Sequence, residues 1–139
     1  MAEQTAHALE APANGTFCWT ELATTDIEVA KKFYTELLGW TLKQGDAGGT
    51  IYNEIVANGR EQGGMYQMGP EQGGAPSHWM AYVAVDDVDA KAKQVEELGG
   101  KVCVPPMDIP NVGRFCVIND PTGATLSLIT LSGGGGSAS

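Results

Sequence analysis

The feature of this sequence that most constrains its fold is an internal repeat. When the chain of 139 residues is shifted by 60 positions, the segment WTELATTDIEVAKKFYTELLGW (19–40) lies over WMAYVAVDDVDAKAKQVEELGG (79–100). Seven of the 22 aligned positions are identical, and the two segments also share their order of turn residues and apolar positions. A repeat of this length indicates one supersecondary unit used twice, because a single unit is too small to bury its own apolar face.

Each copy predicts a strand that leads into a helix. In the first copy, Thr25-x-x-Glu28 forms a capping box, with Asp26 as a competing cap, before apolar residues at a helical period. In the second copy, Asp86 or Asp87 caps the helix, and a glycine follows the helix in both copies. The preceding strands are expected at 16–24 and 78–85.

Three further extended segments follow each helix, separated by turn residues. They are expected at 40–44, 50–58 and 63–68 in the first copy and at 101–109, 113–120 and 124–131 in the second. The order βαβββ therefore occurs twice, in modules 15–69 and 77–131 joined by GPEQGGAPS. We expect the modules to form one domain over 15–131, after an extended arm (1–14) and before a flexible Gly/Ser tail (132–139).

Composition excludes several classes of function. The net charge is −9 and the sequence pI about 4.5, so a nucleic-acid partner is not expected, because such proteins usually carry a basic patch. No apolar run reaches the length of a membrane span, and the N-terminus does not resemble a secretory signal. Three cysteines without metal-ligand spacing suit a reducing cytoplasm, where they would act as small buried apolar residues.

Three stretches carry a resemblance to a known family: ATTDIEVAKKFYTELLGW, VAVDDVDAKAKQVEELGGKV and GRFCVINDPTGATLSLI. Paired βαβββ modules with these stretches resemble the vicinal oxygen chelate superfamily, which includes glyoxalase I, bleomycin-resistance proteins, fosfomycin-modifying enzymes and extradiol dioxygenases. The resemblance implies an α+β fold in which two βαβββ modules pack as one domain with a concave mixed sheet. The chain resembles one half of the tandem-domain glyoxalase-like proteins, and single-domain relatives typically dimerise, so a homodimer is expected.

The resemblance also raises the question of a metal. Metalloenzymes of the superfamily hold a divalent ion with one residue on the first and last strands of both modules, usually His, Gln or Glu. Counted from the helix caps and from the DPTGA turn, these positions correspond here to Trp19, Met80, Ser127 and one of Met65, Tyr66 and Gln67. An indole has no lone pair to offer, and thioether and hydroxyl groups are poor ligands, so no catalytic metal is expected there. The alternative is a displaced divalent-metal site formed by Glu21 and His78, with Tyr82 nearby.

Strand alternation predicts which residues face a ligand. Residues on the cleft side of the strands would form an apolar wall with a few polar groups, as in many small-molecule sites. The candidate ligand-binding residues are Phe17, Trp19, Glu21, Met65, His78, Met80, Tyr82, Arg114 and Ser127. Each also has a structural interpretation: the aromatic residues as core, His78 bonded to backbone or water, and Glu21 or Arg114 in an ion pair.

The leading hypothesis from the sequence is a small-molecule binding protein without a metal, which takes an aromatic or cationic ligand in an apolar cleft. The second is a lyase, isomerase or dioxygenase of the glyoxalase type, in which Glu21 or His78 is a general base or a displaced metal ligand. A third is a protein that acts only by association and fills its own cleft.

Overall fold

The computed structural model describes residues 12–47, 50–70, 74–109 and 112–131, so the expected tail and most of the expected arm lie outside the described residues. The elements are β1 (Phe17–Thr24), α2 (Ile27–Leu38), β2 (Thr41–Ala47), β3 (Thr50–Ala57), β4 (Arg60–Gln67), β5 (His78–Ala84), α3 (Val88–Glu97), β6 (Lys101–Ile109), β7 (Gly113–Asn119) and β8 (Thr125–Leu131). The order βαβββ thus occurs twice, and the predicted α+β class is confirmed. Within the described part of the chain, neither helix is long and apolar enough to cross a membrane.

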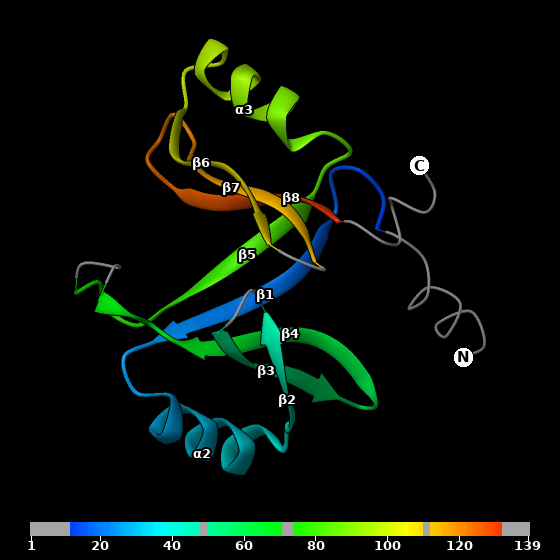
Figure 1. Ribbon diagram of the computed structural model, residues 1–139, viewed down its shortest axis with the longest axis vertical. Coiled ribbons are helices and arrows are strands. Elements are labelled where there is room, and N and C mark those ends of the chain that lie inside the picture. Colours follow the sequence, from blue (N-terminus) through cyan, green and yellow to red (C-terminus); the bar gives the residue numbers. More distant parts are fainter. Residues whose placement is uncertain (1–11, 48–49, 71–73, 110–111, 132–139) are drawn as a thin grey trace. The chain divides into compact units, whose positions relative to one another are not determined.

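The chain forms two compact units, which Figure 1 shows in the colours of the sequence. Among the described residues, one unit comprises those from Trp19 to Met80, and the other comprises those up to Cys18 and those from Ala81 onward. In the first unit, β1 pairs parallel with β4, and β4, β3 and β2 pair antiparallel in turn. The second unit repeats this pattern, with β5 parallel to β8 and with β8, β7 and β6 antiparallel. The two halves of the repeat therefore have the same strand topology and the predicted mixed pairing.

Aspartates cap both helices, which corrects the prediction of a Thr25 capping box. Asp26 accepts a hydrogen bond from the Val29 backbone nitrogen at 3.2 Å, and Asp87 accepts one from the Ala90 nitrogen at 3.1 Å. These N-caps are 61 positions apart, one more than the shift found in the sequence. Structurally equivalent residues at the two helix starts are therefore separated by 61 positions.

Each unit has a hydrophobic core between its own helix and strands. In the first unit the buried cluster consists of Leu22, Ala30, Ile55 and Met65, and in the second of Val85, Val88, Ala92, Cys116 and Leu128. Leu22 and Leu128 therefore lie on the core side of their strands. Cys116 is buried as expected, and burial raises the pKa of its thiol, but Cys103 is exposed, which corrects the expectation of three buried cysteines.

The hairpin between β3 and β4 is tighter than the sequence suggested. Asn58 and Gly59 have φ angles of 53° and 74°, the left-handed conformation that a two-residue hairpin turn requires. Strand β4 therefore begins at Arg60, three residues before the predicted start. Farther along it, Gly63 lies so close to β1 that an added Cβ would be 2.1 Å from the Thr20 carbonyl oxygen.

Candidate functional site

The first unit carries a chain of side-chain hydrogen bonds on one face of β1, β3 and β4. The Trp19 indole donates through Nε1 to the Tyr52 hydroxyl at 2.8 Å, and that hydroxyl donates to Glu21 Oε2 at 2.8 Å. All three side chains are partly buried. Because each donor polarises the next group, such a chain holds the carboxylate in a fixed position more firmly than two isolated bonds would.

Strand register explains how the chain forms. Gly64 on β4 is the register partner of Glu21 on β1 and of Glu54 on β3, so Gly64 lies between two acidic residues on the same face. Tyr52 comes two residues before Glu54 and therefore shares that face. Its ring crosses directly above Gly64, where an added Cβ would be 2.1 Å from the Tyr52 hydroxyl oxygen. The absence of a side chain at Gly64 is what lets Tyr52 reach from β3 to Glu21.

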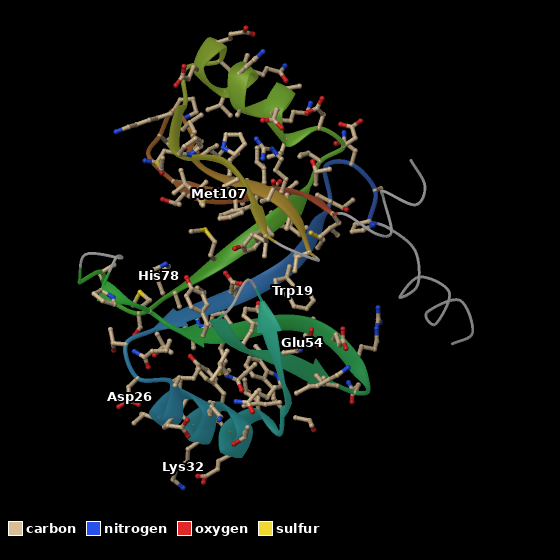
Figure 2. The ribbon with its side chains drawn as sticks, in the orientation of Figure 1. Trp19, Asp26, Lys32, Glu54, His78 and Met107 are labelled. Carbon is tan, nitrogen blue, oxygen red and sulfur yellow. The ribbon has the colours of Figure 1, made fainter. Side chains whose placement is uncertain are left out.

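Aromatic and acidic groups surround this chain. The Tyr52 and Tyr66 rings stack with centroids 6.5 Å apart and planes 22° apart. The pKa of Glu54 is raised, chiefly because burial disfavours its charged form and then because Glu61 lies beside it, while Lys43 acts in the opposite direction. In Figure 2, Trp19 and Glu54 are labelled on this unit. The face thus combines three aromatic side chains with two carboxyl groups.

The structure gives the other predicted site residues of this unit different positions. Met65 pairs in register with Leu22 and is fully buried in the cluster beneath α2, on the opposite face of the sheet from Glu21. This corrects the prediction that Met65 faces the ligand, and we leave it out of the site. His78 is exposed, with Nδ1 2.8 Å from the Pro76 carbonyl oxygen, as the structural interpretation expected. Met80 is half-buried.

Four predicted site residues belong to the second unit: Phe17, Tyr82, Arg114 and Ser127. Phe17 is 73% exposed. Tyr82 is buried and lies beside the Phe115 ring, with centroids 6.4 Å apart. Ser127, the register partner of Tyr82, is fully buried, and its Oγ has no hydrogen-bond partner among the residues that the structure describes. Tyr82 and Ser127 therefore share one face of this unit, as strand alternation predicted.

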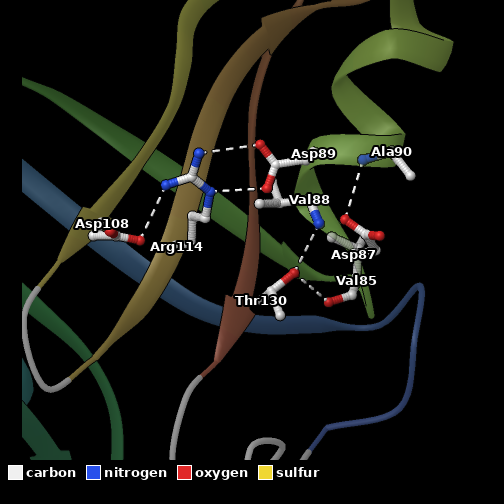
Figure 3. Close-up of polar contacts among 8 residues, drawn as sticks. All are labelled: Val85, Asp87, Val88, Asp89, Ala90, Asp108, Arg114 and Thr130. Atoms are coloured by element: carbon white, nitrogen blue, oxygen red, sulfur yellow. Dashed lines mark hydrogen bonds and ion pairs between the residues drawn. The ribbon is translucent and has the colours of Figure 1, made fainter.

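Arg114 is engaged in ion pairs (Figure 3). Its guanidinium donates to both carboxylate oxygens of Asp89, at 2.8 and 3.1 Å, and to Asp108 at 3.1 Å. The hydrogen bond from Arg114 is the main cause that lowers the pKa of Asp89, and the two acids raise the pKa of Arg114. Arg114 therefore forms ion pairs, as its structural interpretation expected. The candidate site does not include Arg114.

A displaced metal site has little support in the side chains themselves. Among the described residues, no three His, Cys, Asp or Glu side chains gather closely enough to hold an ion together. Glu21 is bonded to Tyr52, and His78 lies against the Pro76 carbonyl group.

Tyr52, Glu54 and Gly64 are the residues of this face that sequence reasoning missed, and Tyr66 was named only as an option for the fourth metal position. Alternation in TIYNEIVA places Tyr52 and Glu54 on one face, but nothing in that segment indicates which face. The Gly-Gly pair at 63–64 was the available signal, because adjacent glycines within a strand often mark a close approach by another group.

The chain is similar in sequence to known proteins over most of its length. Two relatives are CFP32 of Mycobacterium tuberculosis, named "Putative glyoxylase CFP32" (42% identity over 116 residues), and the "Anthracycline biosynthesis protein DnrV" of Streptomyces peucetius (34% over 129). The matches cover 83% and 84% of this chain but 44% and 47% of those proteins. The chain therefore spans about half the length of these relatives.

Solved structures share the fold. Methylmalonyl-CoA epimerase from Mycobacterium tuberculosis has a TM-score of 0.60 at 17% identity, covering 91% of this chain and 97% of the epimerase. Hypothetical protein BH1468 from Bacillus halodurans has a TM-score of 0.65 at 12% identity, covering 87% and 97%. Identities this low establish the fold and not the reaction.

The family is established by a match of the sequence itself. The profile of one family matches residues 16–128, which include the hydrogen-bonded face described above and both βαβββ modules except the end of β8. Proteins of this family often bind a divalent metal and a small molecule. The chain belongs to the Glyoxalase/Bleomycin resistance protein/Dioxygenase superfamily.

Proposed function

We propose that this protein binds a small aromatic, positively charged molecule, without a metal ion, on the face of β1, β3 and β4. The observation that carries the proposal is the hydrogen-bond chain from Trp19 through Tyr52 to Glu21. It places a carboxylate of fixed orientation among aromatic rings. Aromatic faces and a carboxylate attract a cation together, and aromatic surface favours a planar ligand.

The donor set supports binding without the divalent metal that many family members use. Counted from the helix caps and the DPTGA turn, three of the family's four ligand positions correspond to Trp19, Met80 and Ser127. The Trp19 Nε1–H already donates to a phenol, and the other two residues offer a thioether and a buried hydroxyl. These groups do not fit a divalent ion that prefers imidazole or carboxylate ligands, so no step of the proposed function passes through a metal.

The name of one relative suggests a probe. Because DnrV is an anthracycline biosynthesis protein, we choose doxorubicin, a planar anthracycline with an amine that is charged at neutral pH. Its neutral aglycone is the matched ligand control. Calorimetric titration of the protein, after treatment with a chelator and desalting, should detect doxorubicin binding. Weaker binding of the aglycone is expected, because it lacks the charge that Glu21 attracts.

Two variants of equal charge test the role of the carboxylate. Glu21→Gln should weaken doxorubicin binding by about 10-fold and leave aglycone binding nearly unchanged, since one charge interaction is removed. Glu28→Gln removes the same charge from an 80% exposed position on α2 and should change neither affinity. The proposal fails if neither ligand binds, if the chelator abolishes binding, or if the two variants behave alike.

A second candidate is enzymatic, and the same contact supports it. A carboxylate held by Tyr52 is positioned as a general base would be, although a base must also reach the proton that it removes. The fold neighbour at 17% identity is a methylmalonyl-CoA epimerase. Exchange of the α-proton of methylmalonyl-CoA with deuterated water, followed by nuclear magnetic resonance, tests that reaction directly. Exchange that Glu21→Gln abolishes and Glu28→Gln preserves would favour the enzyme over the binding protein.

A further inference from the structure

Two carboxyl groups lie close together on the face proposed for ligand binding. The register between β3 and β4 shifts at a bulge, beyond which Val56 pairs with Glu61. Cross-strand partners share a face, so Glu61 lies on the face of Val56 and of Glu54, two residues earlier on β3. Glu54 is labelled in Figure 2. The bulge therefore brings a second acidic residue to the face that carries Tyr52 and Glu21.

A lysine lies beside both carboxyl groups. Lys43 on β2 is the register partner of Glu54, and its Nζ atom is 3.2 Å from Glu61 Oε2. The Lys43 side chain is 67% exposed, so water screens much of its charge. Burial and then the neighbouring Glu61 raise the pKa of Glu54, and Lys43 acts in the opposite direction. Two carboxylates in such a position repel each other, and this repulsion favours a pair that holds one proton.

The pair also lies within electrostatic reach of Glu21. Gly64 pairs with Glu21 on one side and with Glu54 on the other, so the two acidic residues are separated by two strand spacings, about 10 Å. Charges at that distance still interact on a partly buried face. The titratable and charged groups that face Glu54 among the described residues are Lys43 from β2, Tyr52 from β3, Glu61 from β4 and Glu21 from β1.

We infer that the Glu54–Glu61 pair holds one proton in the free protein and releases it when a cation binds on this face, so that the affinity for a cationic ligand rises with pH. The inference rests on the proposed binding of a positively charged molecule at Glu21. The proton leaves a carboxyl oxygen of the pair and passes to the buffer, and no other bond changes. Because binding and ionisation favour each other, each must strengthen the other to the same extent.

The sign and size of the effect follow from this coupling. A bound cation favours the ionised pair, so the affinity is lower at acid pH, rises as pH passes through the pKa of the free pair, and is constant above it. One charge interaction across several ångströms of a partly exposed face corresponds to about a fivefold difference in affinity between the two limits. Near the midpoint, binding should then release about 0.4 proton per ligand.

Calorimetric titration with doxorubicin from about pH 4.5 to about pH 7 measures the affinity over the range in which a glutamate with a raised pKa ionises. Repeating each titration in two buffers with different heats of ionisation counts the protons released. The neutral aglycone is the matched ligand control. It should bind with the same affinity at every pH and release no proton, because it brings no charge to the pair.

Three variants identify the source of the proton. Glu54→Gln should bind doxorubicin at each pH with the lower affinity that the wild type shows at acid pH, and should release no proton, because glutamine cannot ionise. Lys43→Met removes the cation that favours the charged pair, so the rise in affinity should move to higher pH. Glu28→Gln, at an 80% exposed position on α2, is the control and should keep both the rise and the proton release.

The outcomes separate this inference from the proposed function. Glu21→Gln should weaken doxorubicin binding at every pH and still release the proton. A wild-type protein that binds doxorubicin with constant affinity and no proton release overturns the inference and leaves the proposed function standing. A Glu54→Gln protein that keeps the pH dependence also overturns it, since the proton then comes from another group. If doxorubicin does not bind at all, both are refuted.

Discussion

The substitution Gly64→Ala tests the hydrogen-bonded face most directly, because it changes one methyl group at its centre. The added Cβ would lie 2.1 Å from the Tyr52 hydroxyl oxygen and 2.3 Å or less from two ring carbons. No Cβ tolerates such distances, so the Tyr52 ring must swing away from β4. The backbone of Gly64 is not in the left-handed region, and alanine can therefore adopt its conformation.

The cost follows from the two bonds that the ring makes. Losing the bonds from Trp19 and to Glu21 should cost about 1 kcal/mol for the neutral pair and about 2 kcal/mol for the pair with the carboxylate. Replacing glycine by alanine reduces the entropy of the unfolded chain and returns about 0.7 kcal/mol. The expected loss in the free energy of unfolding is therefore about 2 kcal/mol.

The same substitution in a Tyr52→Ala variant should change stability in the opposite direction, which tests the reasoning. In a Tyr52→Ala chain the ring is absent, so Gly64→Ala meets no obstacle and should stabilise the protein by about 0.7 kcal/mol. Urea unfolding followed by circular dichroism measures the free energy of unfolding of all four proteins of this cycle. The comparison requires that the slope of this free energy with urea concentration is the same in each. If Gly64→Ala costs the same with and without Tyr52, the ring does not lie where the argument requires. If it is neutral in the wild type, the two hydrogen bonds together contribute only about 0.7 kcal/mol, far less than the argument requires.

Four further predictions follow from single contacts. Gly63→Ala should destabilise more than Gly64→Ala in the same urea assay, because its Cβ would meet the backbone of β1 rather than the end of a side chain. Glu54→Gln should leave stability unchanged at acid pH and raise it at pH values above the folded-state pKa of Glu54. Because that pKa is raised, the stability of the wild type falls as pH rises through it, and glutamine has no proton to lose. Asp120 has the opposite sign, because hydrogen bonds from Thr122 and from backbone nitrogens lower its pKa. Its contribution to stability is present above the unfolded-state pKa and is lost as pH falls through the folded-state pKa. Asp120→Asn should therefore make stability depend less on pH in that acid window. Ser127→Ala should raise the unfolding temperature, by an amount equivalent to about 1 kcal/mol, because it removes a buried hydroxyl that has no partner among the described residues.

Local patterns in the sequence predicted the elements of the fold, and they failed where two local rules competed. The repeat, both helices and all eight strands follow from periodicity and turn residues, which act within a few positions. The first cap was different, because Thr25 and Asp26 both satisfy the rule for a helix start. Contacts from distant residues occupy Thr25: its nitrogen donates to Ser77 Oγ at 3.0 Å, and its carbonyl accepts from Gln67 Nε2 at 2.8 Å. A pattern of near neighbours cannot contain that information.

The candidate site was only half predictable for a related reason. Alternation placed Trp19 and Glu21 on one face, because that depends on β1 alone. The face of Met65 depends on register between β1 and β4, where Met65 pairs with Leu22 above the core. The reach of Tyr52 depends on the width of two strands and on an open space above Gly64. Register is set by pairing between distant segments, so it cannot be found by counting residues from a helix cap or a turn.

The second unit has the same register, but different side chains occupy the positions that form the Trp19–Tyr52–Glu21 hydrogen bonds in the first unit. Tyr82 pairs with Ser127, and Val117 pairs with Ser127 from the other side, as Glu21 and Glu54 pair with Gly64. Phe115 then occupies the place of Tyr52, and it does contact the residue equivalent to Glu21, since its ring lies 6.4 Å from that of Tyr82.

The two units therefore share one arrangement, in which an aromatic side chain contacts a residue two strands away, past a small residue on the strand between them. In the second unit the reaching side chain has no hydroxyl and its target has no carboxylate, so the contact is between two rings. In the first unit both polar groups are present, and the contact becomes a hydrogen bond that fixes a carboxylate. An arrangement that only supported the sheet would serve with either chemistry, as the second unit shows. The polar version is therefore not required by the fold, and this is the physical reason to look for ligand binding at Glu21.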